Sequence, residues 1–420
     1  MKFAVFVWLA FLIPGFLIGQ ENAYGDPAYK AVTIIPGAER MDLYLSFLKG
    51  KSVAVFANQT SIVGDTHLVD ALLSKGVNIQ KIFAPEHGFR GEADAGEGVS
   101  NLIDAKTSVP IVSLYGDKTK PSAEDLKGID VMIFDIQDVG VRFYTYISSL
   151  QKYVEAAIEN NKTVLVLDRP NPNGFYVDGP LLESSFKSFV GMQPIPVVYG
   201  MTMAEYIAML LGEKMLSATA SLHNIFIVGK VPIGKATAGA FQLLLVPCKN
   251  YTHKSRYILP VRPSPNLPNM QSVYLYPSIC FFEGTRISLG RGTNKPFQQF
   301  GSPVFPKDLY SFTPQRTAGA KNPLLLDQIC YGYDLSSIDI GKEIGGHLNL
   351  NWLIKAYELY PAKKDFFLAS GYFNKLAGNS TLMQQIKDGK KETDIRKSWE
   401  PELKTFKKIR KKYLLYPDFE

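Results

Sequence analysis

Short, uninterrupted apolar runs alternate with segments of helical spacing along the first half of the chain, and this alternation restricts the fold more than any other feature. Such runs predict strands that are buried on both faces, as in a parallel sheet covered by helices on both sides. The predicted strands are 51–57, 79–84, 111–114, 131–134, 163–167, 222–228 and 243–246, and helical spacing is found at 68–73, between 116 and 131, at 145–160 and at 202–215. The sequence therefore predicts an α/β fold.

Polar residues follow several of these strands. Right-handed crossovers bring the carboxyl ends of parallel strands to one edge of the sheet, where ligands bind in open α/β folds. The residues expected to converge there are Asn58, Glu86, His87, Tyr115, Asp138, Arg142 and Asp168. The segment 84–92 contains one Pro, two Gly and four ionisable residues, so neither a helix nor a strand continues through it. We therefore expect Glu86 at the rim of a site.

Carboxylates are concentrated on this loop, which carries Glu86, Glu92 and Glu97. Burial and mutual repulsion can drive neighbouring carboxyl groups to different pKa values, which suits the acid and base roles of glycoside cleavage. Glu86, His87 and Asp138 also leave a divalent-metal hydrolase open. We favour His87 as a residue that orients Glu86 by a hydrogen bond.

A second cluster combines a carboxylate, a cation and aromatic rings in Asp138, Arg142, Phe143, Tyr144 and Tyr146. This combination suits a sugar that carries an acidic substituent. The start of a helix with a buried aromatic stripe explains the same residues. The sequence leaves both interpretations open.

Motifs of several other enzyme classes are incomplete or absent. Residues 229–235 approach a phosphate-binding loop, but Ala236 replaces the required Ser or Thr, and Pro232 removes one backbone amide. The first predicted strand is not followed by dinucleotide-binding glycines, and neither a Gly-x-Ser-x-Gly nucleophile elbow nor a His-Glu-x-x-His zinc motif occurs. No cofactor is expected.

The length of 420 residues and a change in composition indicate two domains. A Pro-rich linker, 262–269, can be neither a helix nor a central strand, and we place the boundary shortly before it. Domains 25–248 and 249–420 follow a predicted signal peptide, 1–24, whose apolar run is too short and too interrupted for a membrane span. The protein is therefore expected in a periplasm or outside the cell, without a transmembrane anchor.

Cysteine usage and charge restrict the class further. Cys248, Cys280 and Cys330 are few and far apart, which argues against a disulfide framework and for buried apolar roles. The net charge of +7 is concentrated in 387–412. We favour a solvated helix face for this run, with an anionic envelope polymer as the alternative, and we expect no nucleic acid as a partner. One face of that terminal helix is predicted to pack on the body through Trp399, Leu403, Phe406, Arg410 and Tyr413.

Long sequence words in fixed order carry a family resemblance. They include Pro-Glu-His-Gly-Phe-Arg-Gly at 85–91, Ser-Leu-Tyr-Gly at 113–116, Phe-Asp-Ile-Gln-Asp-Val-Gly at 134–140, Arg-Phe-Tyr-Thr-Tyr at 142–146, Leu-Asp-Arg-Pro-Asn-Pro at 167–172, Ser-Pro-Asn at 264–266, Glu-Gly-Thr at 283–285 and Gly-Arg-Gly-Thr at 290–293. These words resemble those of the exo-β-N-acetylmuramidases of peptidoglycan turnover, a family long catalogued as a domain of unknown function. The resemblance covers nearly the whole mature chain. It implies a Rossmann-like parallel-sheet domain followed by a smaller α+β domain, with the active site in the cleft between them.

The resemblance also implies an activity, the release of N-acetylmuramic acid from the non-reducing ends of peptidoglycan fragments or muropeptides. Glu86 is implied as the catalytic residue, Glu283 is the candidate partner from the second domain, and His87 is expected to orient Glu86. The substrate-binding residues that we expect at these words and strand ends are Asn58, Arg90, Glu92, Tyr115, Asp138, Arg142, Tyr144, Asp168, Arg169, Asn171, Asn266 and Arg291.

The expected mechanism begins with protonation of the glycosidic oxygen by Glu86 as general acid in a partly dry cleft. Arg142 or Arg291 would bind the lactyl carboxylate. Glu283 would then act as nucleophile or base, or the substrate's acetamido oxygen would attack with help from Asp138. Direct double displacement predicts carboxyl groups about 5 Å apart and inversion roughly 6.5 to 9.5 Å, and the sequence does not choose between the routes. A non-catalytic muropeptide-binding protein and an esterase-type or metal-dependent hydrolase are the alternative classes, and the oligomeric state is open.

Overall fold

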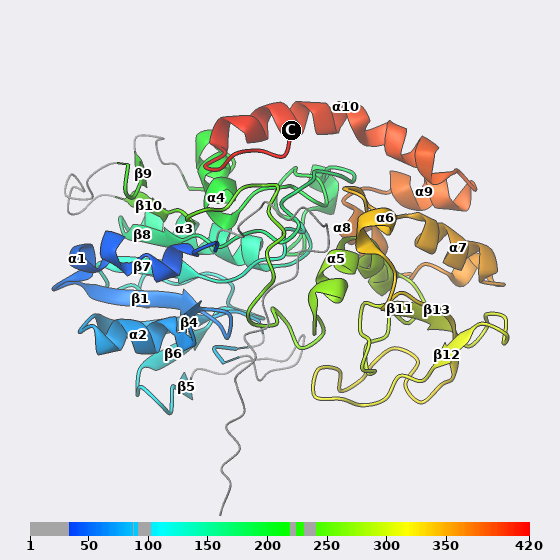
Figure 1. The fold of residues 1–420 in the computed structure, drawn as a ribbon, viewed down its shortest axis with the longest axis horizontal. Coiled ribbons are helices and arrows are strands. Elements are labelled where there is room, and N and C mark those ends of the chain that lie inside the picture. The colour runs from blue at the N-terminus through cyan, green and yellow to red at the C-terminus, as the bar shows by residue number, and fades with distance from the viewer. Residues whose placement is uncertain (1–32, 87, 91–101, 219–223, 231–240) are drawn as a thin grey trace, which may run out of the picture. The chain divides into compact units, whose positions relative to one another are not determined.

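An eight-stranded sheet forms the framework of the first half of the chain in the computed structural model (Figure 1). The structure describes residues 33–86, 88–90, 102–218, 224–230 and 241–420, and residues 34–420 pack as one unit. Several sequence predictions lie outside the described residues: the signal peptide 1–24, His87, Glu92, Glu97 and most of the phosphate-loop match.

The described strands of this sheet follow the order β5-β6-β4-β1-β7-β8-β10-β9. Their bounds are β1 Ser52–Ala57, β4 Asn78–Ala84, β5 Leu102–Ile103, β6 Pro110–Ser113, β7 Val131–Asp135, β8 Thr163–Leu167, β9 Ile225–Ile227 and β10 Gln242–Val246. Neighbours run parallel, except that β5 is antiparallel to β6. The predicted α/β fold is confirmed, and each predicted strand is found with small differences at its ends.

Two apolar layers sandwich the sheet because successive side chains of a strand point to opposite faces. Phe56 contacts the layer that contains α3 (Tyr146–Glu159) and α4 (Met203–Gly212), whereas Val55 contacts the layer that contains α2 (Leu68–Ser74). Both side chains are fully buried. Burial of one such side chain stabilises the fold by about 1.5–3 kcal/mol, which explains why apolar residues predominate in these runs.

The capping box predicted at α4 is confirmed. The Thr202 hydroxyl accepts a hydrogen bond from the Glu205 amide at 3.4 Å, and the Glu205 carboxylate accepts one from the Thr202 amide at 2.9 Å. Each bond satisfies a backbone N–H that a helix start would otherwise leave unpaired. The start of α4 is therefore fixed by its own sequence.

The helical piece predicted before β7 is wrong. The backbone there forms turns, in which the Leu126 amide bonds to the Ala123 carbonyl at 3.2 Å and the Lys127 amide bonds to the Glu124 carbonyl at 3.4 Å. Gly128 then adopts a φ of +73°, which ends the segment before a longer helix can form. Helical spacing in so short a segment does not outweigh its turn residues.

The second half of the chain is the smaller α+β part that the resemblance implied. It contains α5 Met270–Ile279, the 3-10 turn η6 Cys280–Gly284, a three-stranded antiparallel sheet in the order β11-β13-β12 (β11 Gln299–Ser302, β12 Tyr310–Phe312, β13 Cys330–Asp334), and the helices α6 Ile340–Glu343, α7 Asn351–Leu359, α8 Tyr372–Ala377, α9 Thr381–Lys387 and α10 Glu392–Arg410. The remaining elements are η1 Gly37–Glu39, η2 Met41–Leu43, α1 Leu45–Leu48, β2 Ile62–Val63, β3 Thr66–His67, η3 Ser184–Phe186, η7 Lys363–Asp365 and η8 Lys411–Tyr413. The domain boundary predicted at residue 248 stays a prediction.

One aromatic core joins the two halves. The Phe143 ring lies 5.5 Å from Tyr276 and 5.7 Å from Phe281, centroid to centroid. The last helix, α10, returns to the first half, where Arg410 Nε donates to the Gly200 carbonyl at 2.8 Å (Figure 1). Its predicted inward face is confirmed at Trp399, Leu403, Phe406 and Arg410, all of which are buried.

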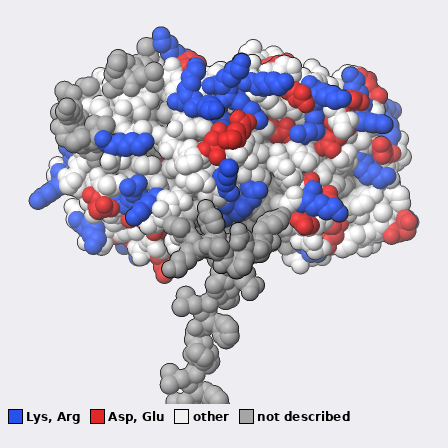
Figure 2. All heavy atoms as spheres, turned by 45° about the horizontal axis from the view of Figure 1, so that its top comes forward, with Lys and Arg blue, Asp and Glu red and all other residues white. Residues whose placement is uncertain are grey.

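The cysteines and the surface charges agree with the sequence pattern. Cys248, Cys280 and Cys330 are buried and free, as predicted. Figure 2 shows Lys and Arg side chains on the face that α10 borders, with acidic side chains between them. Whether this face is only solvated or binds an anionic polymer stays a prediction. Among the described residues, no helix combines the length and the apolar character that a membrane crossing requires.

Candidate active site

A pocket of about 290 Å³ combines side chains from both halves of the chain. Glu86 reaches it from the end of β4 and Tyr115 from the end of β6, as predicted for the carboxyl edge of the sheet. Glu283 reaches it from η6. The lining residues are Glu86, Tyr115, Phe143, Tyr144, Thr145, Tyr146, Phe189, Val190, Ser264, Asn266, Leu267, Tyr276, Glu283, Arg291, Phe297 and Tyr372.

Glu86 is held by hydroxyl groups on both of its oxygens. The Tyr115 hydroxyl donates to Oε1 at 3.1 Å, and the Thr145 hydroxyl lies 3.5 Å from Oε2. The chain turns immediately after it, where the Gly88 amide bonds to the Pro85 carbonyl at 3.0 Å and Gly88 has a φ of +76°. This turn stops β4 and presents the carboxyl group to the pocket.

The phenols beside Glu86 are kept protonated. Burial raises the pKa of Tyr146 first, and the charge of Glu86 raises it further. Burial also raises the pKa of Tyr144, with smaller contributions from Tyr146 and the nearby carboxylates. These rings therefore supply hydroxyl groups and aromatic faces, both of which suit a sugar.

On the opposite wall, Glu283 forms an ion pair with Arg291. Arg291 Nε and Nη2 both donate to Oε1 of Glu283, at 3.0 and 2.5 Å. Burial acts to lower the pKa of Arg291, but the charge and the hydrogen bonds of Glu283 act to raise it, and the net change is upward. The guanidinium also lies 4.9 Å from the Phe297 ring centroid. The pocket thus contains a second carboxylate and a fixed cation.

Two predicted residues lie one layer behind the pocket. Asn58 donates to the Tyr146 hydroxyl at 2.9 Å, so it orients a lining residue. Asp138 accepts from the Tyr199 hydroxyl and from the Gly140 amide, each at 2.6 Å, and burial raises its pKa to about 7. Neither lines the pocket, so the expectation that they contact substrate directly is not supported.

The structure places five further predicted residues away from the pocket: Arg90, Arg142, Asp168, Arg169 and Asn171. Arg90 pairs with Asp104 at 2.8 Å and Arg169 pairs with Asp135 at 2.6 Å. Arg142 donates to four backbone carbonyl oxygens. Their side chains are engaged by other groups of the protein, and direct contact with substrate stays a prediction for these residues.

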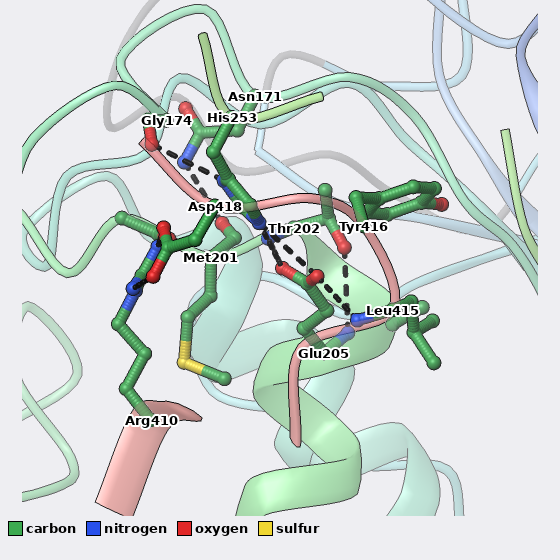
Figure 3. A network of polar contacts seen from close by, with 12 residues as sticks. Asn171, Gly174, Met201, Thr202, Glu205, His253, Arg410, Leu415, Tyr416 and Asp418 are labelled. Carbon is green, nitrogen blue, oxygen red and sulfur yellow. Dashed lines mark hydrogen bonds and ion pairs between the residues drawn. The ribbon is translucent and has the colours of Figure 1, made fainter. Parts of the chain in front are cut away.

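Asp168 and Asn171 belong to a buried polar network beneath the end of the chain. Figure 3 shows how the His253 ring lies between the Gly174 carbonyl, 3.2 Å away, and the Glu205 carboxylate, 3.0 Å away. In the same region, Asp168 accepts a hydrogen bond of 2.6 Å from the Tyr416 hydroxyl. This network anchors residues 410–418 and is separate from the pocket lining.

The structure brings six of the predicted residues into one pocket: Glu86, Tyr115, Tyr144, Asn266, Glu283 and Arg291. The aromatic rings of Phe143 and Tyr146, which the sequence placed in the cluster suited to an acidic sugar, also line the pocket. Sequence reasoning missed Thr145, which lies between them, and it missed Tyr372 because no motif marks it. Among the described residues, no group of three or more His, Cys, Asp or Glu side chains could hold a metal ion.

A parallel sheet completed by a smaller α+β part, with two carboxyl groups in the pocket that both supply, is an architecture suited to glycoside hydrolysis. Comparison with known families agrees. The family model described as "Exo-beta-N-acetylmuramidase NamZ, N-terminal" matches residues 53–271, and its C-terminal counterpart matches 274–416. The chain therefore belongs to the NamZ family of exo-β-N-acetylmuramidases, which are glycoside hydrolases.

Relatives agree with this assignment. The chain is 38% identical over 394 residues to the peptidoglycan β-N-acetylmuramidase NamZ of Bacillus subtilis (strain 168), with 89% of each chain covered. Two solved structures of DUF1343 family proteins from Bacteroides fragilis NCTC 9343 are also similar. One has a TM-score of 0.80 at 44% identity and covers 92% of this chain and 100% of its own. The other has a TM-score of 0.74 at 27% identity and covers 91% and 99%. The resemblance in the sequence words is thereby confirmed.

Proposed function

We propose that this protein releases N-acetylmuramic acid from the non-reducing ends of peptidoglycan fragments, with Glu86 as the general acid. One observation carries the proposal: Glu86 and Glu283, far apart in sequence, line the same pocket. They come from regions that match the N-terminal and the C-terminal family model, respectively. The printed name of the Bacillus subtilis relative, a peptidoglycan β-N-acetylmuramidase, supports the substrate class.

In the proposed reaction Glu86 donates its proton to the glycosidic oxygen as the bond to the anomeric carbon breaks. The hydroxyls of Tyr115 and Thr145 fix the direction of the Glu86 carboxyl group. Glu283 is the second carboxyl group and acts on the anomeric carbon as a nucleophile or through a water molecule. Both routes pass through an oxocarbenium-like state, which a carboxylate stabilises by its charge.

Arg291 is the proposed recognition group for the lactyl carboxylate. Its pair with Glu283 uses two of the five N–H donors of the guanidinium, and its side chain is 28% exposed. A carboxylate on the sugar can therefore reach the same cation. This role would distinguish muramic acid from the related amino sugar that lacks the lactyl group.

The test is Glu86→Gln, assayed with a chromogenic N-acetylmuramide and by identifying the sugar released from peptidoglycan fragments. Gln keeps the shape and the bonds to both hydroxyls but cannot donate a proton, so kcat should fall about 10²–10⁴-fold with an unchanged melting temperature. Glu159→Gln is the matched control, because Glu159 is an exposed residue paired with Lys120. Turnover by Glu86→Gln at the rate of that control would end the assignment.

We also propose that the protein is exported. The support is the apolar run of residues 3–18 after an early Lys, followed by small and polar residues up to 24. N-terminal sequencing of the protein recovered from cell fractions tests this. An N-terminus near residue 25 in a periplasmic or extracellular fraction is expected, and an intact N-terminus in the cytosol would contradict it.

A further inference from the structure

Arg142 directly precedes residues 143–146 of the proposed active site, and its surroundings are unusual for an arginine. It is fully buried, and its hydrogen-bond partners are backbone carbonyl oxygens. Nη1 donates to Pro180 and Ile195 at 2.8 and 2.7 Å, and Nη2 donates to Leu376 and Ala377 at 2.8 and 2.7 Å. The guanidinium thus joins two stretches of the first half to one stretch of the second.

The second-half partners are the last two residues of α8. Helix ends leave carbonyl oxygens without an intrahelical donor, and a cation there is favourable. The approach is close: a Cβ on Gly378, which follows α8, would lie 2.7 Å from Arg142 Nη2. Gly378 also has a φ of +82°, so glycine is required there on both grounds.

Helix α8 in turn belongs to the side of the pocket that carries Glu283 and Tyr372, which we call the Glu283 wall. Its first residue, Tyr372, lines the pocket. Its second residue, Phe373, packs so tightly against Gly284 that a Cβ on Gly284 would lie 2.4 Å from Phe373 Cα. Gly284 is the neighbour of Glu283, so a displacement of α8 moves Tyr372 and Glu283 together.

The opposite side of the pocket, which we call the Glu86 wall, is formed by Glu86 and residues 143–146. Residues 143–146 follow Arg142 directly and line the pocket beside Glu86. The backbone amide of Arg142 is fixed by the Val197 carbonyl at 2.8 Å. One residue therefore fixes the base of the Glu86 wall by its backbone and holds the Glu283 wall by its side chain.

We propose that Arg142 is a positioning residue that sets the distance between the Glu86 wall and the Glu283 wall of the pocket. A planar guanidinium presents donors to four acceptors in fixed directions, whereas the ammonium of lysine is a single point with three donors. Charge alone therefore does not preserve the distance. This inference rests on the proposed active site, since it concerns the geometry of that pocket.

The decisive variant is Arg142→Lys, which keeps the charge and loses the four-point bond pattern. A displacement of about 1 Å between reacting groups can cost about 10²-fold in rate, so kcat should fall by about that factor while KM changes by less than about threefold. Arg410→Lys is the matched control. Arg410 is also buried and donates to a backbone carbonyl, that of Gly200, but its other partner is Asp418 and it does not line the pocket.

A second experiment separates positioning from a general loss of structure. Arg142→Ala is assayed with millimolar methylguanidinium, which can occupy the vacated space and restore the four bonds. Recovery of kcat with methylguanidinium but not with methylammonium supports the proposal. If Arg142→Ala does not fold, the kcat of Arg142→Lys still tests whether Arg142 is a positioning residue.

Three outcomes overturn the inference. They are a folded Arg142→Lys enzyme with unchanged kcat, an equal loss of kcat in Arg410→Lys, and a loss confined to KM, which would mean that Arg142 contacts substrate. Glu86→Gln is measured in parallel. Full activity of Glu86→Gln would reject the proposed active site, whereas an inactive Glu86→Gln beside a fully active Arg142→Lys would reject the positioning role alone.

Discussion

Asp138→Asn should stabilise the protein at neutral and alkaline pH. Asp138 is buried, and its partners are the Tyr199 hydroxyl and the Gly140 amide, both on Oδ2. Oδ1 has no hydrogen-bond partner among the residues that the structure describes. Asparagine keeps an acceptor oxygen for both bonds and removes a negative charge from an apolar environment, and the variant has nearly the same volume.

The magnitude follows from the pKa. Burial raises the pKa of Asp138 from 3.8 to about 7, which corresponds to about 4 kcal/mol of cost when the carboxyl group must ionise in the folded protein. Below the unfolded pKa the group is protonated in both states, so the ionisation cost is absent. The ionisation cost grows above pH 3.8, where Asp138 loses its proton in the unfolded chain, and it reaches its full size above about pH 7, where Asp138 also ionises in the folded protein.

The assay is urea unfolding of wild type and Asp138→Asn between pH 4 and pH 8. The difference in the free energy of unfolding should be small at pH 4 and should rise to about 4 kcal/mol in favour of the variant at pH 8. Comparing the two proteins at each pH removes contributions from other groups, such as Asp168, whose pKa burial also raises to about 7. A difference that does not change with pH would refute the reasoning, because it would mean that the folded protein ionises Asp138 without cost.

Two further variants test the roles assigned to the other arginines. Arg169→Leu leaves the buried Asp135 without its partner and should cost about 3–5 kcal/mol in urea unfolding, with a loss below about 1 kcal/mol arguing against a structural ion pair. Arg291→Gln should reduce kcat/KM for an N-acetylmuramide about 10-fold or more relative to the matching N-acetylglucosaminide, since a charge-assisted hydrogen bond to the lactyl group is lost. Equal losses on both substrates would speak against lactyl recognition by Arg291.

Local signals predicted the sheet well. The strands β1, β7 and β8 are apolar on both faces, and a run of that kind is readable without knowledge of its neighbours. The capping box at Thr202 is equally local. The segment before β7 failed because its helical spacing competes with turn residues over a few positions, where spacing carries little information.

The pocket could be predicted only in part. Glu86 and Tyr115 follow strands, so the topology alone brings them to one edge of the sheet. Glu283 was a candidate through the family resemblance, and Tyr372 arrives from a helix whose position depends on tertiary packing. Arg142 has the polarity of a binding residue, but polarity in a sequence does not say whether a substrate or a backbone carbonyl will be the partner.

The aromatic core around Phe143, Tyr276 and Phe281 has a practical consequence for engineering. A cut between residues 271 and 274, where the two family models meet, would expose aromatic side chains on both fragments. It would also separate Glu86 from Glu283. A chimera that combines the two parts from different relatives should therefore keep the aromatic contacts of Phe143 with Tyr276 and Phe281.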